Sequence, residues 1–216
     1  MIKQLRWMVV LALLGLTVLP ARAASPVYVF HGIDRVALAL WAGASDGIVT
    51  QVSVTAQNSL AQNPPANPSG NPFAVTLVRI VQYAENCPIW VEGCAPLVSI
   101  DGFAQADGVT IDQSLAAGRL NTTLTVHDAV SGQDYPVAVD LAWTGVGKVL
   151  RNTGRAHVIR EGGFQLVSTG YDFRRQAEVS GNVVNLATNT NYVESLAVYG
   201  ELERAAGHTI TLEIGG

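Results

Sequence analysis

The sequence contains little cysteine, little charge and little aromatic residue, and each scarcity argues against a class of protein. Two cysteines are present among 216 residues, too few on their own for a zinc site built on two cysteine pairs. Charged residues make up 14% and hydrophobic residues 49%, which argues against disorder. Aromatic residues make up 7%, and the apolar stretches lack the aromatic girdles of an outer-membrane barrel. Helical periodicity is also scarce, so the chain is expected to fold mainly as strands.

The first 23 residues have the layout of a secretory signal peptide. Lys3 and Arg6 precede an apolar run at residues 8–19, and an A-x-A cleavage site ends at Ala23. The apolar run is shorter than the roughly 20 residues that a membrane-spanning helix needs. The sequence therefore predicts a secreted or periplasmic protein whose mature part, residues 24–216, is one domain without a transmembrane segment.

Both cysteines lie in one short segment. Cys87 and Cys94 enclose six residues that include Pro88, Trp90 and Gly93. Disulfides persist in an oxidising compartment, and proline and glycine favour a turn that would bring the thiols together. A structural disulfide is therefore expected, with free thiols and a metal or redox pair as the alternatives. Trp90 would lie on the stapled loop, either as a contact residue for a partner or folded back onto the core.

Alternation of apolar and polar residues predicts an all-β fold. The segment 196–206 could form a short helix, but the residues before it favour a strand. Many short strands at regular spacing indicate a single-domain antiparallel β-sandwich or a closed or partly open β-barrel, here with one disulfide. The strand patterns fall at residues 27–33, 36–41, 48–56, 73–83, 120–127, 137–143, 164–168, 192–199 and 208–214.

One segment, residues 58–72, is rich in proline and asparagine. Proline has no N–H donor and a fixed φ, so this stretch is not expected inside a sheet. Too few residues precede it in the mature chain for a separate domain. The sequence predicts a mobile surface loop there.

The predicted mature chain is acidic overall but basic in one region. Of 13 Lys and Arg, three fall in the first 23 residues, which leaves 10 against 17 Asp and Glu and a net charge of 10 − 17 = −7. An acidic surface does not suit nucleic acid. Residues 145–175 differ, with six Lys and Arg against two acidic residues, a balance of +4.

The basic region suggests a site for an anionic ligand. Arginine forks suit carboxylate, sulfate or phosphate groups. On an extended strand Arg151, Arg155 and His157 share one face, unless Gly154 interrupts the strand. The alternative is a solvated face neutralised by acidic residues of neighbouring strands. The candidate ligand-binding residues are Arg151, Arg155, His157, Arg174, Arg175 and Trp90.

The sequence contains no motif with the full pattern of a catalytic or metal-binding site. Residues 43–47 match the G-x-S-x-G nucleophile elbow, but a strand pattern follows where the elbow needs a helix, so a hairpin turn is expected. Loop aspartates could bind calcium, although none has the spacing of a calcium loop. The four histidines are scattered, and His127 and Asp128 would face opposite sides of a strand. The sequence predicts no catalytic residue, no metal site and no cofactor.

One pattern resembles a group of secreted bacterial proteins of unassigned function. It comprises Trp143-Thr144-Gly145-Val146-Gly147, then Gly163-Phe164, then Arg175-Gln176-Ala177-Glu178-Val179-Ser180-Gly181. The resemblance covers 40–50 residues and implies an exported β-domain. Its glycines and tryptophan suit turns, bulges and core packing, so it implies no catalytic residues.

These observations favour a non-enzymatic binding or interaction module for an anionic ligand, a glycan or a protein partner. A hydrolase acting on cell-envelope or extracellular polymers is the first alternative. A cleft with two close carboxyl groups, one of raised pKa, would favour it. A structural surface component is the second alternative. Convergence of the arginines on one exposed face beside aromatic residues would favour the binding module.

Overall fold

The computed structural model describes residues 27–63, 67–88, 91–105, 109–161 and 164–214. These residues form strands and connecting turns without a helix, which confirms the all-β prediction. The predicted signal peptide lies outside the described residues. The strands are β1 (Val27–Ser45), β2 (Ile48–Asn63), β3 (Asn67–Ala84), β4 (Val98–Ala104), β5 (Val109–Ile111), β6 (Ala117–Asp128), β7 (Gln133–Gly145), β8 (Leu150–Glu161), β9 (Phe164–Asn185), β10 (Thr190–Asn191) and β11 (Ala197–Ile214).

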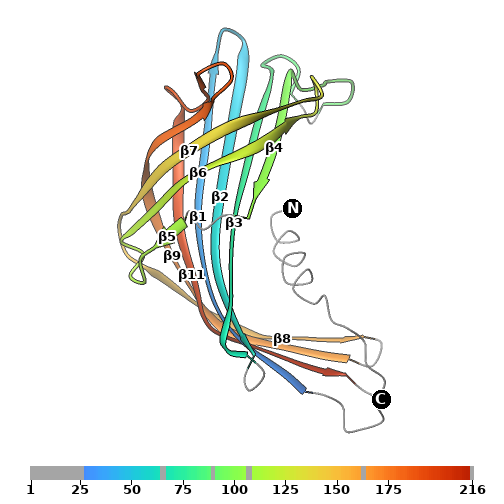
Figure 1. Ribbon diagram of the computed structural model, residues 1–216, viewed down its shortest axis with the longest axis vertical. Coiled ribbons are helices and arrows are strands. Elements are labelled where there is room, and N and C mark those ends of the chain that lie inside the picture. The colour runs from blue at the N-terminus through green and yellow to red at the C-terminus, as the bar shows by residue number, and fades with distance from the viewer. Residues whose placement is uncertain (1–26, 64–66, 89–90, 106–108, 162–163, 215–216) are drawn as a thin grey trace.

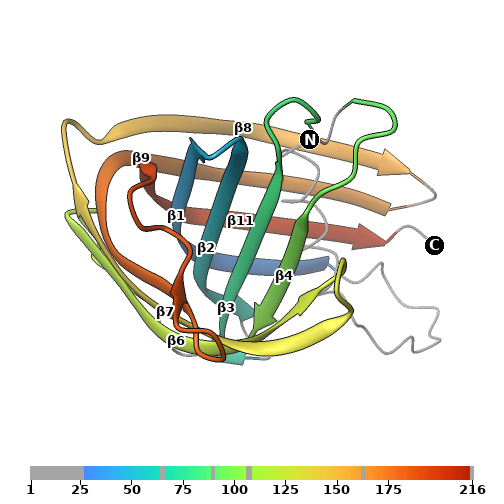
Figure 2. The same cartoon turned by 90° about the horizontal axis from the view of Figure 1, so that it is seen from above.

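All the strands belong to one antiparallel sheet that closes into a ring. The pairings run β9-β11-β1-β2-β3-β4-β6-β7, and β7 pairs again with β9. The view from above in Figure 2 shows the strands curving round a common interior. The ring is not a regular barrel, because β4 and β6 share only three residue pairs and several strands run far beyond it.

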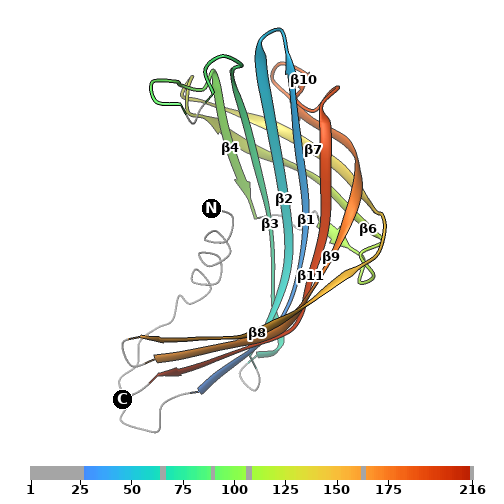
Figure 3. The ribbon, with the colours of Figure 1, turned by 180° about the vertical axis from the view of Figure 1, so that it is seen from behind.

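The strands that run beyond the ring form an open arm. β7 and β8 pair with the same edge of β9, β7 with residues 177–185 and β8 with residues 164–174. The turn at residues 146–149 separates them, so the chain bends where the ring ends. Figures 1 and 3 show β8 and the adjoining ends of β1, β9 and β11 leaving the ring as this arm.

The core fills the ring and follows the predicted alternation. Leu120, Leu124 and Val126 of β6 are buried while their neighbours along the strand are mostly exposed. Leu141 and Trp143 of β7 repeat the pattern. Because strand side chains alternate between faces, one face of each strand lines the interior and the other meets solvent.

Most of the predicted loop at residues 58–72 is strand, and residues 64–66 lie outside the described residues. Residues 58–63 continue β2 and residues 67–72 begin β3, and the two strands pair, for example Leu60 with Pro72. Proline is tolerated because β3 pairs with β4 only at residues 76–82. Pro72 thus lies where β3 has one described neighbour and no second ladder bond is required.

The disulfide prediction is confirmed. Cys87 and Cys94 are joined, with their Cα atoms 5.3 Å apart, in the connection between β3 and β4. Trp90 lies outside the described residues, so its role stays a prediction. A disulfide is compatible with an extracellular or periplasmic location. No helix in the described part of the chain is long and apolar enough to cross a membrane.

Candidate functional site

A row of polar and aromatic residues crosses five strands where the ring meets the arm. Asn58 of β2 lies opposite Arg35 of β1, which lies opposite Arg204 of β11. Arg204 lies opposite Phe173 of β9, and Phe173 lies opposite Arg151 of β8. Residues directly opposite each other in a sheet have side chains on the same face. These five side chains therefore project from one face of the sheet.

This face is the one that lines the ring interior. Arg35 is two residues from buried Ala37, and Arg204 is two residues from buried Leu202. Side chains two residues apart on a strand share a face. Arg175 lies opposite Leu202 and therefore shares it too. Arg35, Arg151, Arg175 and Arg204 are called the arginine face below.

Aromatic rings position two of these guanidinium groups. The guanidinium carbon of Arg204 lies 4.6 Å from the ring centroid of Phe173. That of Arg151 lies 4.4 Å from the ring centroid of Tyr171 and 5.9 Å from that of Phe173. A cation over an aromatic face is attracted by the ring quadrupole. The stacked guanidinium keeps its edge, which carries the N–H donors, available for an acceptor.

Three arginines of this face lack hydrogen-bond partners for their Nε atoms. The Nε atoms of Arg35, Arg175 and Arg204 are buried, and no described group accepts from them. No ion pair joins these three side chains to a described carboxylate. An unsatisfied buried donor costs about 1–3 kcal/mol. Arg35 and Arg204 are also like charges directly opposite each other, which is unfavourable in a sheet.

The charge of one arginine of this face acts on an acidic residue. Hydrogen bonds from Ser114, and more weakly the charge of Arg35, hold the pKa of Asp112 below its ordinary value. Asp112 belongs to the turn between β5 and β6 and is exposed. One carboxylate does not neutralise four arginines, so among the described residues the arginine face is positive within a chain that is acidic overall.

A glycine of the W-T-G-x-G pattern makes room for this arrangement. A Cβ on Gly145 would lie 2.2 Å from the carbonyl oxygen of Leu115 and 2.8 Å from Cδ of Arg175. Both contacts are closer than real Cβ atoms allow, and the first involves backbone that cannot swing aside. Gly145 therefore permits the close approach of β7, the β5–β6 turn and Arg175.

The structure brings together some predicted site residues and separates others. Arg151 and Arg175 lie on the arginine face, as the basic-region hypothesis requires. Arg174 does not, because it faces the opposite side, where its buried Nε lies 2.9 Å from Oε1 of Glu203 in an ion pair whose geometry is not that of a hydrogen bond. This is the local neutralisation that the alternative interpretation expected. For Arg155 and His157 of β8 the backbone is described but the side chains are not, and the β8–β9 register shifts between residues 154 and 157.

Sequence reasoning missed two members of the site, Arg35 and Arg204. They are far apart in sequence and outside the basic region, so no local charge cluster marked them. The alternation of side chains along the strand does give a signal for Arg35, because Arg35 continues the alternating pattern that ends in buried Trp41. A charged residue on the buried parity of a strand pattern was the available signal.

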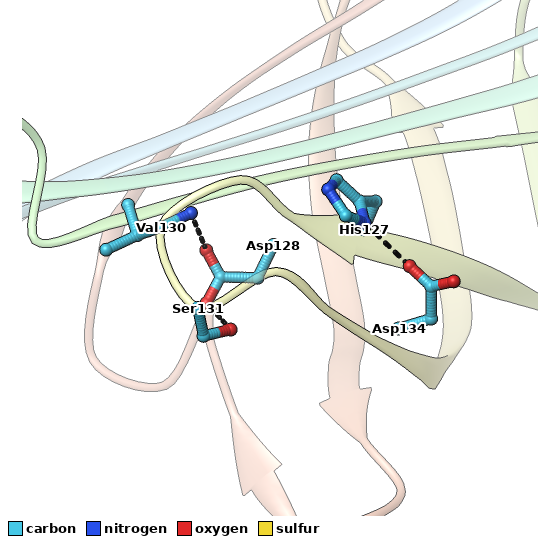
Figure 4. A network of polar contacts seen from close by, with 5 residues as sticks. All are labelled: His127, Asp128, Val130, Ser131 and Asp134. Carbon is cyan, nitrogen blue, oxygen red and sulfur yellow. Dashed lines mark hydrogen bonds and ion pairs between the residues drawn. The ribbon is translucent and has the colours of Figure 1, made fainter.

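A second polar cluster lies at the turn between β6 and β7. Figure 4 shows His127 paired with Asp134 across the hairpin, while Asp128 points to the turn. The His127 Nδ1 and Asp134 Oδ1 atoms are 2.7 Å apart, and both side chains are more than half exposed. Asp128 is buried and accepts hydrogen bonds from Ser131 and the Val130 amide. His127 and Asp128 thus face opposite ways, as predicted.

The Asp128 carboxylate stabilises this turn. Burial alone would raise its pKa, but hydrogen bonds from Ser131, Val130 and Ser99 outweigh that effect and lower the pKa. A carboxyl group whose pKa is lowered by folding stabilises the protein above its unfolded pKa and loses that contribution as pH falls. We expect Asp128→Asn to lose about 1–2 kcal/mol of unfolding free energy at pH 7.

Urea unfolding at pH 7 and pH 3 checks this expectation. The difference between wild type and Asp128→Asn should shrink at pH 3, which lies below the ordinary pKa of an aspartate and nearer the lowered pKa of Asp128. The exposed Asp134→Asn is the control and should differ little from wild type at pH 7. A wild-type advantage that stays constant between the two pH values would show that the charge of Asp128 is not responsible.

The G-x-S-x-G match and the metal-ligating residue types can be located in the described part of the chain. The G-x-S-x-G match spans the hairpin turn between β1 and β2, where Asp46 and Gly47 have φ values of 53° and 74°, so the turn interpretation is confirmed. In the described part of the chain no three His, Cys, Asp or Glu side chains are grouped to hold a metal ion.

Comparisons with known proteins give only distant structural similarity. No protein family and no curated protein sequence matches the chain. Among solved structures it is similar to the enduracididine biosynthesis enzyme MppR complexed with pyruvate, with a TM-score of 0.27 and 10% identity over 88% of this chain and 90% of that chain. The same enzyme with HEPES buffer bound gives a TM-score of 0.21 and 10% identity over 91% and 89%. Similarity at this level does not indicate a function for this chain.

Proposed function

We propose that the chain is an exported, non-enzymatic protein that binds an anionic ligand at the arginine face. The observation that carries the proposal is the set of three buried Nε donors, on Arg35, Arg175 and Arg204, that have no partner in the part of the chain the structure describes. Retaining such donors costs folding free energy, and an anion is the kind of group that would satisfy them. Arg151 adds a fourth positive charge beside the aromatic rings.

Two further observations favour binding over hydrolysis. Among the described residues, the carboxyl groups with displaced pKa values are Asp112 and Asp128, and both values move downward. This is the direction of a carboxylate that stays charged, whereas a general acid needs a raised pKa. The acidic groups paired with arginine, such as Glu203 with Arg174, lie on the opposite face and leave the arginine face positive.

Isothermal titration of the purified protein with phosphate, sulfate and citrate tests the proposal. We expect binding that weakens with salt, because exposed charge interactions are screened. Arg35→Met and Arg204→Met should each weaken it at least tenfold, since a charge-assisted hydrogen bond contributes about 1.5–3 kcal/mol. The control Arg119→Met removes an equal charge from an exposed position and should change binding less than about threefold.

The same variants report on stability. Arg35→Met removes an unsatisfied donor and a like-charge pair while keeping an unbranched side chain, so it should raise the unfolding free energy by about 1 kcal/mol. Gain of stability with loss of binding is typical of residues retained for function. Absence of binding by every anion, or equal loss in Arg119→Met, would overturn the proposal.

A further inference from the structure

We infer that the arginine face holds a tetrahedral oxyanion ester, that is, a phosphate or sulfate group attached to an organic ligand. This inference rests on the proposed function and narrows it to one class of anion. Three observations support it: the number of unpartnered donors, their placement on three adjacent strands, and the aromatic rings beside them.

The number of donors exceeds what one carboxylate can accept. Each of Arg35, Arg175 and Arg204 offers an edge on which Nε–H and a neighbouring Nη–H point the same way. Three such edges present about six N–H donors, and a carboxylate has about four lone-pair sites on two oxygens. A terminal phosphate or sulfate has three free oxygens and can accept from all three edges.

The three arginines occupy neighbouring positions in the sheet. Arg35 and Arg204 are directly opposite, which places their Cβ atoms about 4.5–5.5 Å apart. Arg175 is two residues beyond Phe173, the partner of Arg204, and so is its diagonal neighbour at about 7–8 Å. Arginine side chains are long enough to converge across these spacings.

The aromatic rings indicate an ester instead of a free inorganic ion. Phe173 lies in the same row, between Arg204 and Arg151, and Tyr171 lies under Arg151. Tyr171 is 43% exposed, so ring surface remains available to the organic part of a ligand. The charged group would contact the arginine edges while its organic group packs against these rings.

Titration with matched probes tests the class of anion. Phenyl phosphate, phenyl sulfate, benzoate and phthalate carry the same ring with different acidic groups, and inorganic phosphate lacks the ring. We expect phenyl phosphate or phenyl sulfate to bind at least tenfold more tightly than benzoate and phthalate, and more tightly than the corresponding inorganic anion. Comparing the two esters distinguishes a phosphorylated from a sulfated ligand.

Arginine-to-lysine variants separate hydrogen-bond geometry from charge. Arg204→Lys keeps the charge but replaces the planar fork by a point charge, so it should weaken phenyl phosphate or phenyl sulfate binding about tenfold. Arg174→Lys makes the same change on the opposite face and should leave binding unchanged. Equal binding of benzoate or phthalate, with the same dependence on Arg204, would overturn the ester class and leave anion binding intact. No binding of any probe would overturn both.

Discussion

Gly181→Ala is expected to destabilise the protein by at least about 3 kcal/mol. Gly181 has a φ of 122°, a conformation that other residues rarely adopt. A Cβ there would lie 2.0 Å from the carbonyl oxygen of Asp140 on β7. Because the obstacle is the backbone of the paired strand, β7 and β9 would have to separate where they close the ring. Urea unfolding followed by circular dichroism measures the loss.

Gly132→Ala is the matched control for Gly181→Ala. Gly132 also has a positive φ, 70°, but nothing lies within 4 Å of the added Cβ. Gly132→Ala should therefore lose only the free energy that a positive φ costs a residue with a Cβ atom, about 1–2 kcal/mol. Equal losses in the two variants would show that β7 yields to the added methyl group, and the close approach at Gly181 would then not matter for stability.

Trp143→Ala is expected to cost about 3–5 kcal/mol, the range for truncating a buried tryptophan. Trp143 is 1% exposed and belongs to the core of the ring. Its indole Nε1 donates a 2.9 Å hydrogen bond to the carbonyl oxygen of Leu38, on the strand across the interior. The side chain therefore joins β7 to β1 both by packing and by a hydrogen bond.

Trp143→Phe separates these two contributions. Phenylalanine keeps an aromatic ring in the core but cannot donate to Leu38, so the loss should be smaller than for alanine by about 1–2 kcal/mol or more. Val198→Ala, at a 41% exposed position, is the control and should change stability by less than about 0.5 kcal/mol. If Trp143→Phe loses as much unfolding free energy as Trp143→Ala, packing of an aromatic side chain in the core is not the contribution of Trp143.

The sequence allowed the strands to be predicted where one face is buried and the other exposed. Leu120 and Leu141 mark such strands, and both predictions are confirmed. Prediction failed where the structure of a residue depends on which strands lie beside it. Proline is typical of loops, but Pro72 can pair in the sheet because only one partner strand lies beside it. Tyr192 was expected to begin a strand, whereas residues 192–195 form a turn between β10 and β11.

The candidate site was only half predictable from sequence. Charge clustering identified Arg151 and Arg175, because they lie in one basic segment. It also included Arg174, which differs from Arg175 only in the face of β9 that it occupies. The alternation of the strands could place Arg35 on a buried face, but it could not predict that Arg35 lies opposite Arg204. That contact depends on the pairing of β1 with β11, and alternation does not show which strands are neighbours.

The pairing of β1 with β11 also constrains the order of folding. Ala42 lies opposite Ala197, so the ring is completed by a contact between the first and the last long strand of the described chain. Contacts of such sequence separation form slowly, because the entropy of closing the intervening loop is lost before the contact is gained. Until β11 arrives, β1 and β9 each keep an open edge that can pair with another chain. Arg35 and Arg204 become neighbours through this same pairing, so the arginine face is complete only once β1 and β11 have joined.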